Sequence, residues 1–218
     1  MKTKALHRLL KFVVPEMPNY VPKGNILFVS PIEHVLQGIA FQSSSFSPSI
    51  FDIDVFVQPL YIPSETLTFY FVKRIPGIWE WAEGEEPNLA QRIILELRKQ
   101  PSLHDELRTP SDIAEKCVGL SSAENPHILE AVAYSLALIG RQREALVTLE
   151  SVAKRVSGIP KQWGLNPSVT WPAEMLERIR RVTAALEVSV DNVRKLLLRW
   201  ESGSVEALGL SRFRLKSE

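Results

Sequence analysis

The stretch Ile50–Lys73, IFDIDVFVQPLYIPSETLTFYFVK, contains the clearest periodic pattern in the chain. Apolar residues alternate with other residues from position 51 to 57, and they alternate again from 67 to 71. A period of two residues is typical of strands that bury one face. The segment Pro-Ser-Glu at 63–65 predicts a tight antiparallel return between the two strands. An isolated hairpin is only marginally stable in water, so we expect other elements to cover it.

Two more strands are predicted upstream, at residues 25–29 and 33–43, because their apolar residues follow the same period. Ser30-Pro31 separates these two strands. The polar connector at 43–49 is short, which favours a loop over a crossover helix and therefore an antiparallel meander. We expect an α+β fold with a roughly four-stranded antiparallel sheet between residues 25 and 75, followed by a mostly helical part.

Helix boundaries are predicted from capping residues, from prolines at first helical positions and from glycines after last turns. The predicted helices cover residues 3–14, 87–100, 110–118, 126–139, 142–157, 172–186 and 191–202. We divide the chain into residues 1–80, an N-terminal helix plus the sheet, and residues 81–218, a helical region packed on or beside the sheet. One continuous domain is the alternative.

The segment ALIGRQREALVTLESVA at residues 137–153 places Gly140 at a turn, with Ala145 and Leu149 at packing positions of the second helix. It resembles the central part of a tetratricopeptide unit, and the resemblance extends over about residues 126–157. This similarity implies a helical hairpin and no ligand site.

Composition excludes several classes of protein. The formal net charge is +1, so no global charge attracts nucleic acid or anionic membranes. Cys117 is the single cysteine, which excludes an internal disulfide and a multi-cysteine zinc site. No window approaches the roughly 18 apolar residues of a membrane span. We expect a soluble, cytoplasmic protein without a cofactor.

Asp52 and Asp54 alternate in one predicted strand, so both carboxylates project from the same face. Such a pair could hold a divalent cation, and a metal-dependent hydrolase is therefore the alternative function. A hard cation needs several more oxygen ligands, however, and no neighbouring pattern supplies them. Two acids on the wet face of a sheet are the simpler interpretation.

Other reactive residues favour structural roles. His34 and Glu33 are neighbours in a predicted strand and point to opposite faces, so they cannot activate each other. Cys117 lies late in a short helix, where a thiol is typical of a small core residue. Nucleic-acid binding through basic residues of the last two helices is a second alternative, although acidic residues are interleaved among them. These basic residues are Arg178, Arg180, Arg181, Arg194, Lys195 and Arg199.

A loop after Arg74 combines Trp79 and Trp81 with acidic residues, and it is the predicted binding site. The acids are Glu83, Glu85 and Glu86. Aromatic anchors flanked by acids suit a basic protein partner. The alternative is structural, with the tryptophans closing the core and the acids complementing the dipole of the next helix. Without a convergent catalytic motif, we expect a non-catalytic interaction protein of bacterial type, an adaptor or an immunity-like partner.

Overall fold

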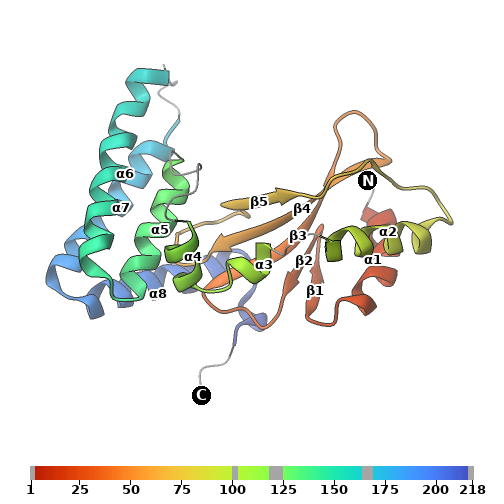
Figure 1. The fold of residues 1–218 in the computed structure, drawn as a ribbon, viewed down its shortest axis with the longest axis horizontal. Coiled ribbons are helices and arrows are strands. Elements are labelled where there is room, and N and C mark those ends of the chain that lie inside the picture. The colour runs from red at the N-terminus through yellow and green to blue at the C-terminus, as the bar shows by residue number, and fades with distance from the viewer. Residues whose placement is uncertain (1–2, 100–102, 118–124, 164–168, 216–218) are drawn as a thin grey trace. The chain divides into compact units, whose positions relative to one another are not determined.

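The computed structural model describes residues 3–99, 103–117, 125–163 and 169–215 (Figure 1). The chain forms two compact units, and each combines segments that are distant in the sequence. Unit 1 consists of Met1–Gln58, Phe71–Arg108 and Leu210–Glu218, and unit 2 consists of Pro59–Tyr70 and Thr109–Gly209. The sheet lies in unit 1 and the long C-terminal helices lie in unit 2, which confirms the predicted α+β class.

Unit 1 is built around a six-stranded sheet with the order β1-β2-β3-β4-β5, in which β6 also pairs with β4. The strands are β1 (Tyr20–Lys23), β2 (Ile26–Val29), β3 (Val35–Ser43), β4 (Ile50–Pro59), β5 (Phe71–Arg74) and β6 (Trp79–Glu80). The pairs β1–β2, β2–β3, β4–β5 and β4–β6 are antiparallel, and the antiparallel direction is the one predicted for β2–β3 and β4–β5. The predicted number of four strands is too low, because β1 contains Pro22, a residue that argues against a strand, and β6 has two residues, which show no period.

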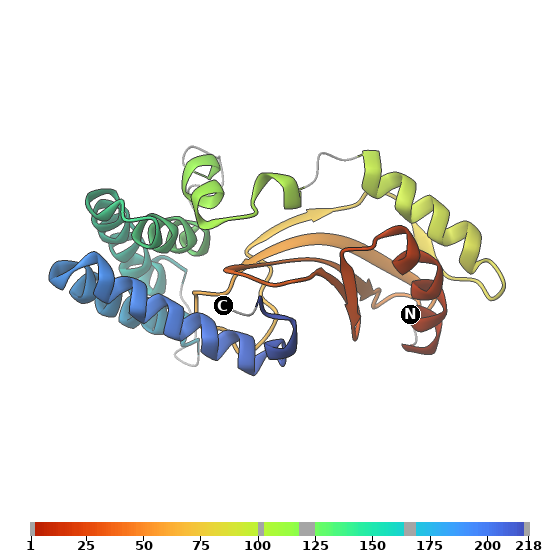
Figure 2. The same ribbon diagram turned by 90° about the horizontal axis from the view of Figure 1, so that it is seen from below.

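Helices α1 (Thr3–Val13) and α2 (Glu86–Lys99) lie side by side on one face of this sheet (Figure 2). Leu9 of α1 and Ile93 of α2 are fully buried in the same apolar cluster as Ile39 of β3 and Ile53 of β4. Burial of apolar surface stabilises this layer by about 25 cal/mol per Å². The amphipathic pattern predicted for residues 3–14 therefore serves to cover the sheet.

The opposite face of the sheet is packed by aromatic side chains. Phe213, in the short 3₁₀ helix η3 (Ser211–Phe213), contacts Phe28 edge-to-face with 4.9 Å between ring centroids. The ring of Phe56 crosses over Gly38, where a Cβ atom would lie 2.5 Å from the ring. Only glycine fits at this position, because any side chain would collide with a packed ring.

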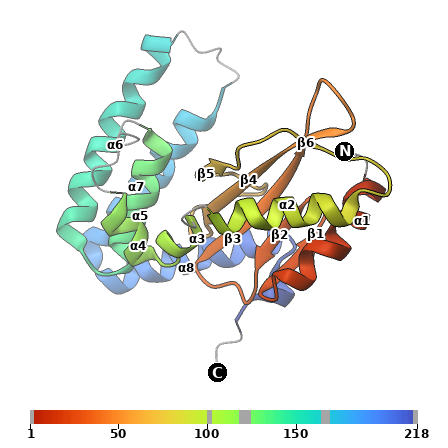
Figure 3. The same cartoon turned by 45° about the vertical axis from the view of Figure 1, so that its right-hand side comes forward.

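Unit 2 consists mainly of helices that pack on one another (Figure 3). They are α4 (Pro110–Lys116), α5 (Pro126–Leu138), α6 (Gln142–Trp163), α7 (Trp171–Val188) and α8 (Val190–Ala207). Helix α5 contacts α4, α6 and α8, and α7 contacts α6 and α8. Among the helices that the structure describes, none combines the length and apolar character needed to cross a membrane.

The predicted caps of unit 2 are largely confirmed. Thr109 accepts a hydrogen bond from the backbone N–H of Asp112 in a capping box, and Asn125 caps α5. Gly140 ends α5 with a φ of 83°, a conformation that favours glycine. The predicted helix end at Gly158 is wrong, because Val156 and Ile159 continue the buried stripe of α6 through it. The predicted helix ends at Pro101 and Gly119 lie outside the described residues.

The predicted tight return at residues 63–65 is also wrong. Strand β4 ends at Pro59 and β5 begins at Phe71, and the segment between them belongs to unit 2. Ser135 donates to the carbonyl oxygen of Ala131, so its oxygen accepts the hydrogen bond of the Tyr61 hydroxyl at 2.5 Å. Leu60, Tyr61 and Ile62 are fully buried. Their burial among helices outweighs the short hairpin that local alternation favours.

Candidate functional site

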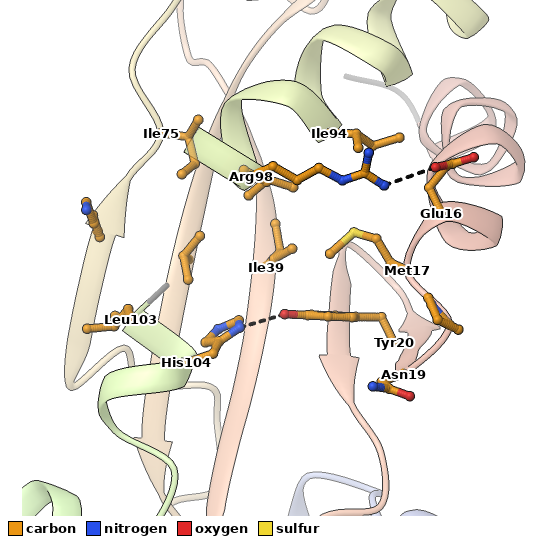
Figure 4. A pocket seen from close by; sticks show the side chains of 14 residues that line it. Glu16, Met17, Asn19, Tyr20, Ile39, Ile75, Ile94, Arg98, Leu103 and His104 are labelled. Atoms are coloured by element: carbon orange, nitrogen blue, oxygen red, sulfur yellow. Dashed lines mark hydrogen bonds and ion pairs between the residues drawn. The ribbon is translucent and has the colours of Figure 1, made fainter. Parts of the chain in front are cut away.

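A pocket of about 290 Å³ opens on the helix-covered face of the sheet in unit 1 (Figure 4). Its floor is formed by the central strands, with Ile39 from β3, Val55 from β4 and Lys73 from β5. Its walls are the end of α2, the short helix α3 (Leu103–Glu106), and the segment that leads into β1. The wall residues are Glu16, Met17, Pro18, Asn19, Tyr20, Ile75, Ile94, Leu97, Arg98, Leu103 and His104.

A hydrogen bond between Tyr20 and His104 closes one end of the pocket, with 2.7 Å between the phenol oxygen and Nδ1 (Figure 4). Nε2 of the same imidazole lies 3.1 Å from the carbonyl oxygens of both Gly38 and Phe56. Carbonyl oxygens only accept hydrogen bonds, so Nε2 carries a proton, and in the neutral ring Nδ1 accepts from the Tyr20 hydroxyl. This geometry is satisfied by a neutral imidazole and a protonated phenol.

Burial reinforces the neutral state of both groups. It lowers the pKa of His104, an effect that the hydrogen bonds to Phe56 and Gly38 only partly oppose. Burial also raises the pKa of Tyr20 to about 12, and the charge of Asp105 adds to this shift. At neutral pH neither group supplies a charge to the pocket.

Helix α3 is held on the sheet by its backbone as well as by the His104 ring. Gln37 of β3 donates from Nε2 to the carbonyl oxygens of His104, at 2.6 Å, and of Leu107, at 3.1 Å. The side chain of Gln37 is buried, so these bonds satisfy a polar group that would otherwise be costly to bury. Helix α3 is therefore fixed to the sheet both through its backbone and through the His104 ring.

An ion pair between Arg98 and Glu16 closes the other end of the pocket, with 3.1 Å between Nη2 and Oε2 (Figure 4). Both side chains are more than half exposed, at 62% and 55%. Exposed ion pairs of this kind contribute about 0.2–1 kcal/mol. The two ends of the pocket thus differ: one is a buried neutral bridge and the other is a weak charged one.

Lys73 is the charged residue of the pocket floor. It lies opposite Val55 in the β4–β5 register, so it projects from the same face as the apolar core. Within the described part of the chain no acid forms an ion pair with Lys73, whereas Arg98 is paired with Glu16. The pocket lining therefore carries one positive charge in excess over an apolar floor.

Asp52 and Asp54 do share a face of β4, but an arginine lies between them rather than an open site. Arg74 Nη1 lies 3.2 Å from Asp52, and Arg74 Nε lies 3.0 Å from Asp54. Gln42 Nε2 donates to Asp54 at 2.6 Å. The described residues contain no cluster of three or more His, Cys, Asp or Glu side chains that could hold a metal. The guanidinium thus supplies the positive charge that these carboxylates need.

The predicted binding loop contributes mainly to packing. Trp79 is 2% exposed, and its indole N–H donates to the Ile75 carbonyl oxygen at 3.4 Å. Trp81 is half-buried against the same core. That this loop binds a protein partner stays a prediction, but Trp79 offers little exposed surface to such a partner.

The acids of that loop are engaged around the helix ends. Arg8 of α1 lies 2.6 Å from Glu83 and 3.9 Å from Glu86, and Glu85 accepts from Asn88 at 2.9 Å. These contacts tie α1 to the start of α2, where negative charge also complements the helix dipole. They support the structural alternative for these three acids.

Cys117 and the basic residues of the last two helices lie in unit 2. Cys117 is buried, and burial raises the pKa of its thiol to about 11, so it is not a ready nucleophile. Arg178 binds Glu130, Arg181 lies over the Trp200 ring, and Arg194 donates to the Leu138 carbonyl oxygen. These arginines therefore have intramolecular partners.

Sequence reasoning missed the pocket. One signal was present, because Lys73 follows positions 67, 69 and 71 at the apolar parity of a strand, where a lysine is unexpected. Tyr20 and His104 carry no such signal, since each lies in an aperiodic segment. No protein family, curated protein or solved structure matches this chain.

Proposed function

We propose that this protein is a non-catalytic binding protein whose pocket in unit 1 holds a small anion with an apolar body, such as a medium-chain carboxylate. The observation that carries the proposal is Lys73, a cation without an ion pair among the described residues, on a floor of Ile39 and Val55. A charge beside apolar surface interacts more strongly with a counter-charge than it does in water. An amphipathic anion satisfies both parts of this lining.

The size and character of the pocket agree with a small ligand. Its volume of about 290 Å³ lies at the low end of the range of roughly 300–1,000 Å³ that is typical of ligand sites. Ile94, Leu97 and Leu103 supply apolar walls. Each methylene that such walls remove from water contributes about 0.8 kcal/mol.

The polar groups of the pocket support binding rather than catalysis. A general base needs a free lone pair of suitable pKa within reach of the substrate. Nδ1 of His104 already accepts from Tyr20, and its Nε2–H is used by Gly38 and Phe56. Among the described residues of the lining there is no cysteine or serine nucleophile.

Isothermal titration calorimetry with octanoate and with octanol tests the proposal. Octanoate should bind, and Lys73→Gln should weaken it by about tenfold, the loss expected for a charge-assisted contact. Octanol, which lacks the charge, should bind weakly and be insensitive to this substitution. Lys4→Gln on α1 removes the same charge outside the pocket and is the matched control. Equal affinity for the two ligands, or no effect of Lys73→Gln, would overturn the proposal.

A protein partner remains the second candidate function, and it is favoured by the tip of the β3–β4 connection. Phe46 is 97% exposed there, and Ile78, beside β6, is 77% exposed. Ser49 donates to Glu80 at 3.1 Å, which joins the connection to β6 and places an acid nearby. This proposal keeps the adaptor or immunity-like role, a basic partner, and a cytoplasmic location.

Affinity capture from the native host, followed by binding measurements with the purified partner, tests this second candidate. Phe46→Ser should reduce the affinity for that partner by tenfold or more, because exposed aromatic anchors dominate interface energies. Val188→Ser, at a 70% exposed residue of unit 2, is the control and should bind normally. If the unmutated protein, Phe46→Ser and Val188→Ser all bind the partner equally, then Phe46 does not belong to the interface.

A further inference from the structure

A second hollow, of about 410 Å³, lies between α1 and α2 on the outer side of the pocket. Phe12 of α1 and Leu95 of α2 line it, and both are unusually exposed for large apolar residues, at 45% and 55%. Pro87, Ala90 and Ile94 complete its apolar lining, and Gln91 also lines it. We call this hollow the α1–α2 groove.

The groove and the pocket share one wall. Glu16, Ile94 and Arg98 line both, so the Arg98–Glu16 ion pair lies between the two hollows. Because both side chains are exposed, separating them costs little, and either can turn into solvent. Opening this pair would join the groove and the pocket into one continuous channel.

Charge sets the direction in which a ligand would lie. Of the cations that line the two hollows, Lys73 has no ion pair among the described residues and belongs to the pocket alone, whereas the groove contributes apolar residues and Gln91 beyond the shared ion pair. An anionic head at Lys73 leaves the groove for an apolar tail. Such a tail would cover Phe12 and Leu95.

We propose that the ligand is a free fatty acid with a chain longer than that of octanoate, with its carboxylate at Lys73 and its tail passing between Arg98 and Glu16 into the α1–α2 groove. This inference rests on the proposed function, because it needs the head-group site in the pocket. The ion pair acts as a gate that octanoate does not have to open. A longer chain must separate Arg98 from Glu16, and it then gains apolar contacts in the α1–α2 groove.

The test is a chain-length series measured by calorimetry with octanoate, decanoate and dodecanoate below their micelle concentrations. If the tail enters the groove, affinity should continue to rise by up to about fourfold per added methylene. Leu95→Ser and Phe12→Ser should lower dodecanoate affinity by about tenfold and leave octanoate affinity unchanged. Val72→Ser, at a residue of similar exposure, 53%, on β5, is the matched control.

The gate has its own readout in stopped-flow kinetics. Glu16→Gln removes the ion pair with little change of shape, and it changes the charge of the pocket equally for every acid in the series. The ratio of the dodecanoate to the octanoate association rate constant should therefore rise several-fold. If octanoate binds through Lys73 but dodecanoate is no tighter, the groove inference fails and the pocket function stands. If octanoate does not bind, both fail. Retention on anionic vesicles without binding of monomeric acid would assign the groove to a lipid surface and overturn the inference.

Discussion

The two units each contain a polar link between distant segments, and the two links are of opposite kinds. In unit 1 the neutral pair Tyr20–His104 lines an open pocket. In unit 2 Glu130 of α5 and Arg178 of α7 form a fully charged pair, with Glu130 0% exposed. A buried charge depends on its partner, whereas a neutral group beside a pocket can exchange its partner for water or ligand. The Tyr20–His104 link is therefore compatible with a binding site, whereas the Glu130–Arg178 link stabilises the packing of helices.

The surroundings of the charged pair explain its position. Helix α5 is apolar around nearly its whole circumference and lies among α4, α6 and α8, so Glu130 cannot reach water. Burial alone would lower the pKa of Arg178, but the hydrogen bonds and charge of Glu130 outweigh burial and raise it. Burial also raises the pKa of the neighbouring Tyr134 well above 10. Arg178 therefore stays charged throughout the physiological pH range.

The largest expected effect comes from breaking the charged link. Glu130→Gln leaves Arg178 without its counter-charge, and we expect the free energy of unfolding to fall by about 3–5 kcal/mol. Urea denaturation followed by circular dichroism measures this loss. The double variant Glu130→Leu with Arg178→Met removes both charges and should recover most of it. A loss below about 1 kcal/mol for the single variant would place the pair among weak surface bridges.

Breaking the neutral link from the histidine side should cost less. His104→Phe keeps the ring shape but removes the Nε2–H group that donates to the carbonyl oxygens of Gly38 and Phe56, for an expected loss of about 1–3 kcal/mol. His127→Phe in unit 2 is the control, since the described contacts of that ring are aromatic, with Tyr70 and Trp171. Equal losses in the two variants, again by urea denaturation, would contradict the role of the imidazole hydrogen bonds.

Removing only the tyrosine hydroxyl should have a smaller effect. Tyr20→Phe leaves Nδ1 of His104 facing the pocket, where water can replace the lost donor, so we expect a loss of about 0.5–1.5 kcal/mol. Differential scanning calorimetry of Tyr20→Phe and His104→Phe compares the two sides of the bond. A loss as large as that of His104→Phe would mean that Nδ1 is sealed from water.

The smallest effect is the pH dependence of stability. Burial lowers the pKa of His104 and of His127 below the ordinary value of 6.5. The unfolded chain therefore binds protons first, and the free energy of unfolding should decrease as the pH falls below about 6.5. The loss in free energy of unfolding that comes from protonating His104 is modest, because a protonated ring can still donate from Nδ1 to Tyr20. Unfolding between about pH 7.5 and 5.5 should show this slope, and His104→Phe should reduce it. An unchanged slope would assign the effect to His127, whose neighbours are Glu130 and Arg178.

The sequence by itself determined the features that depend on neighbours along the chain. Periodicity predicted the α+β class and the common face of Asp52 and Asp54, and local hydrogen bonds made the caps at Thr109 and Asn125 predictable. The helical hairpin of α5 and α6 is present, while its tetratricopeptide resemblance stays a prediction. In each case the residues that decide the structure lie within a few positions of one another.

Only the tertiary structure decided where apolar and polar groups meet across long distances in the sequence. Alternation such as that at residues 67–71 does not show whether a segment is buried against a neighbouring strand or against a distant helix. Tyr61, which contacts Ser135 of α5, is buried in the second way. The pocket likewise depends on Lys73, His104 and Tyr20, which no local pattern connects. Burial depends on the total surface that a side chain loses to water, and the partners that remove it are chosen by packing rather than by sequence proximity.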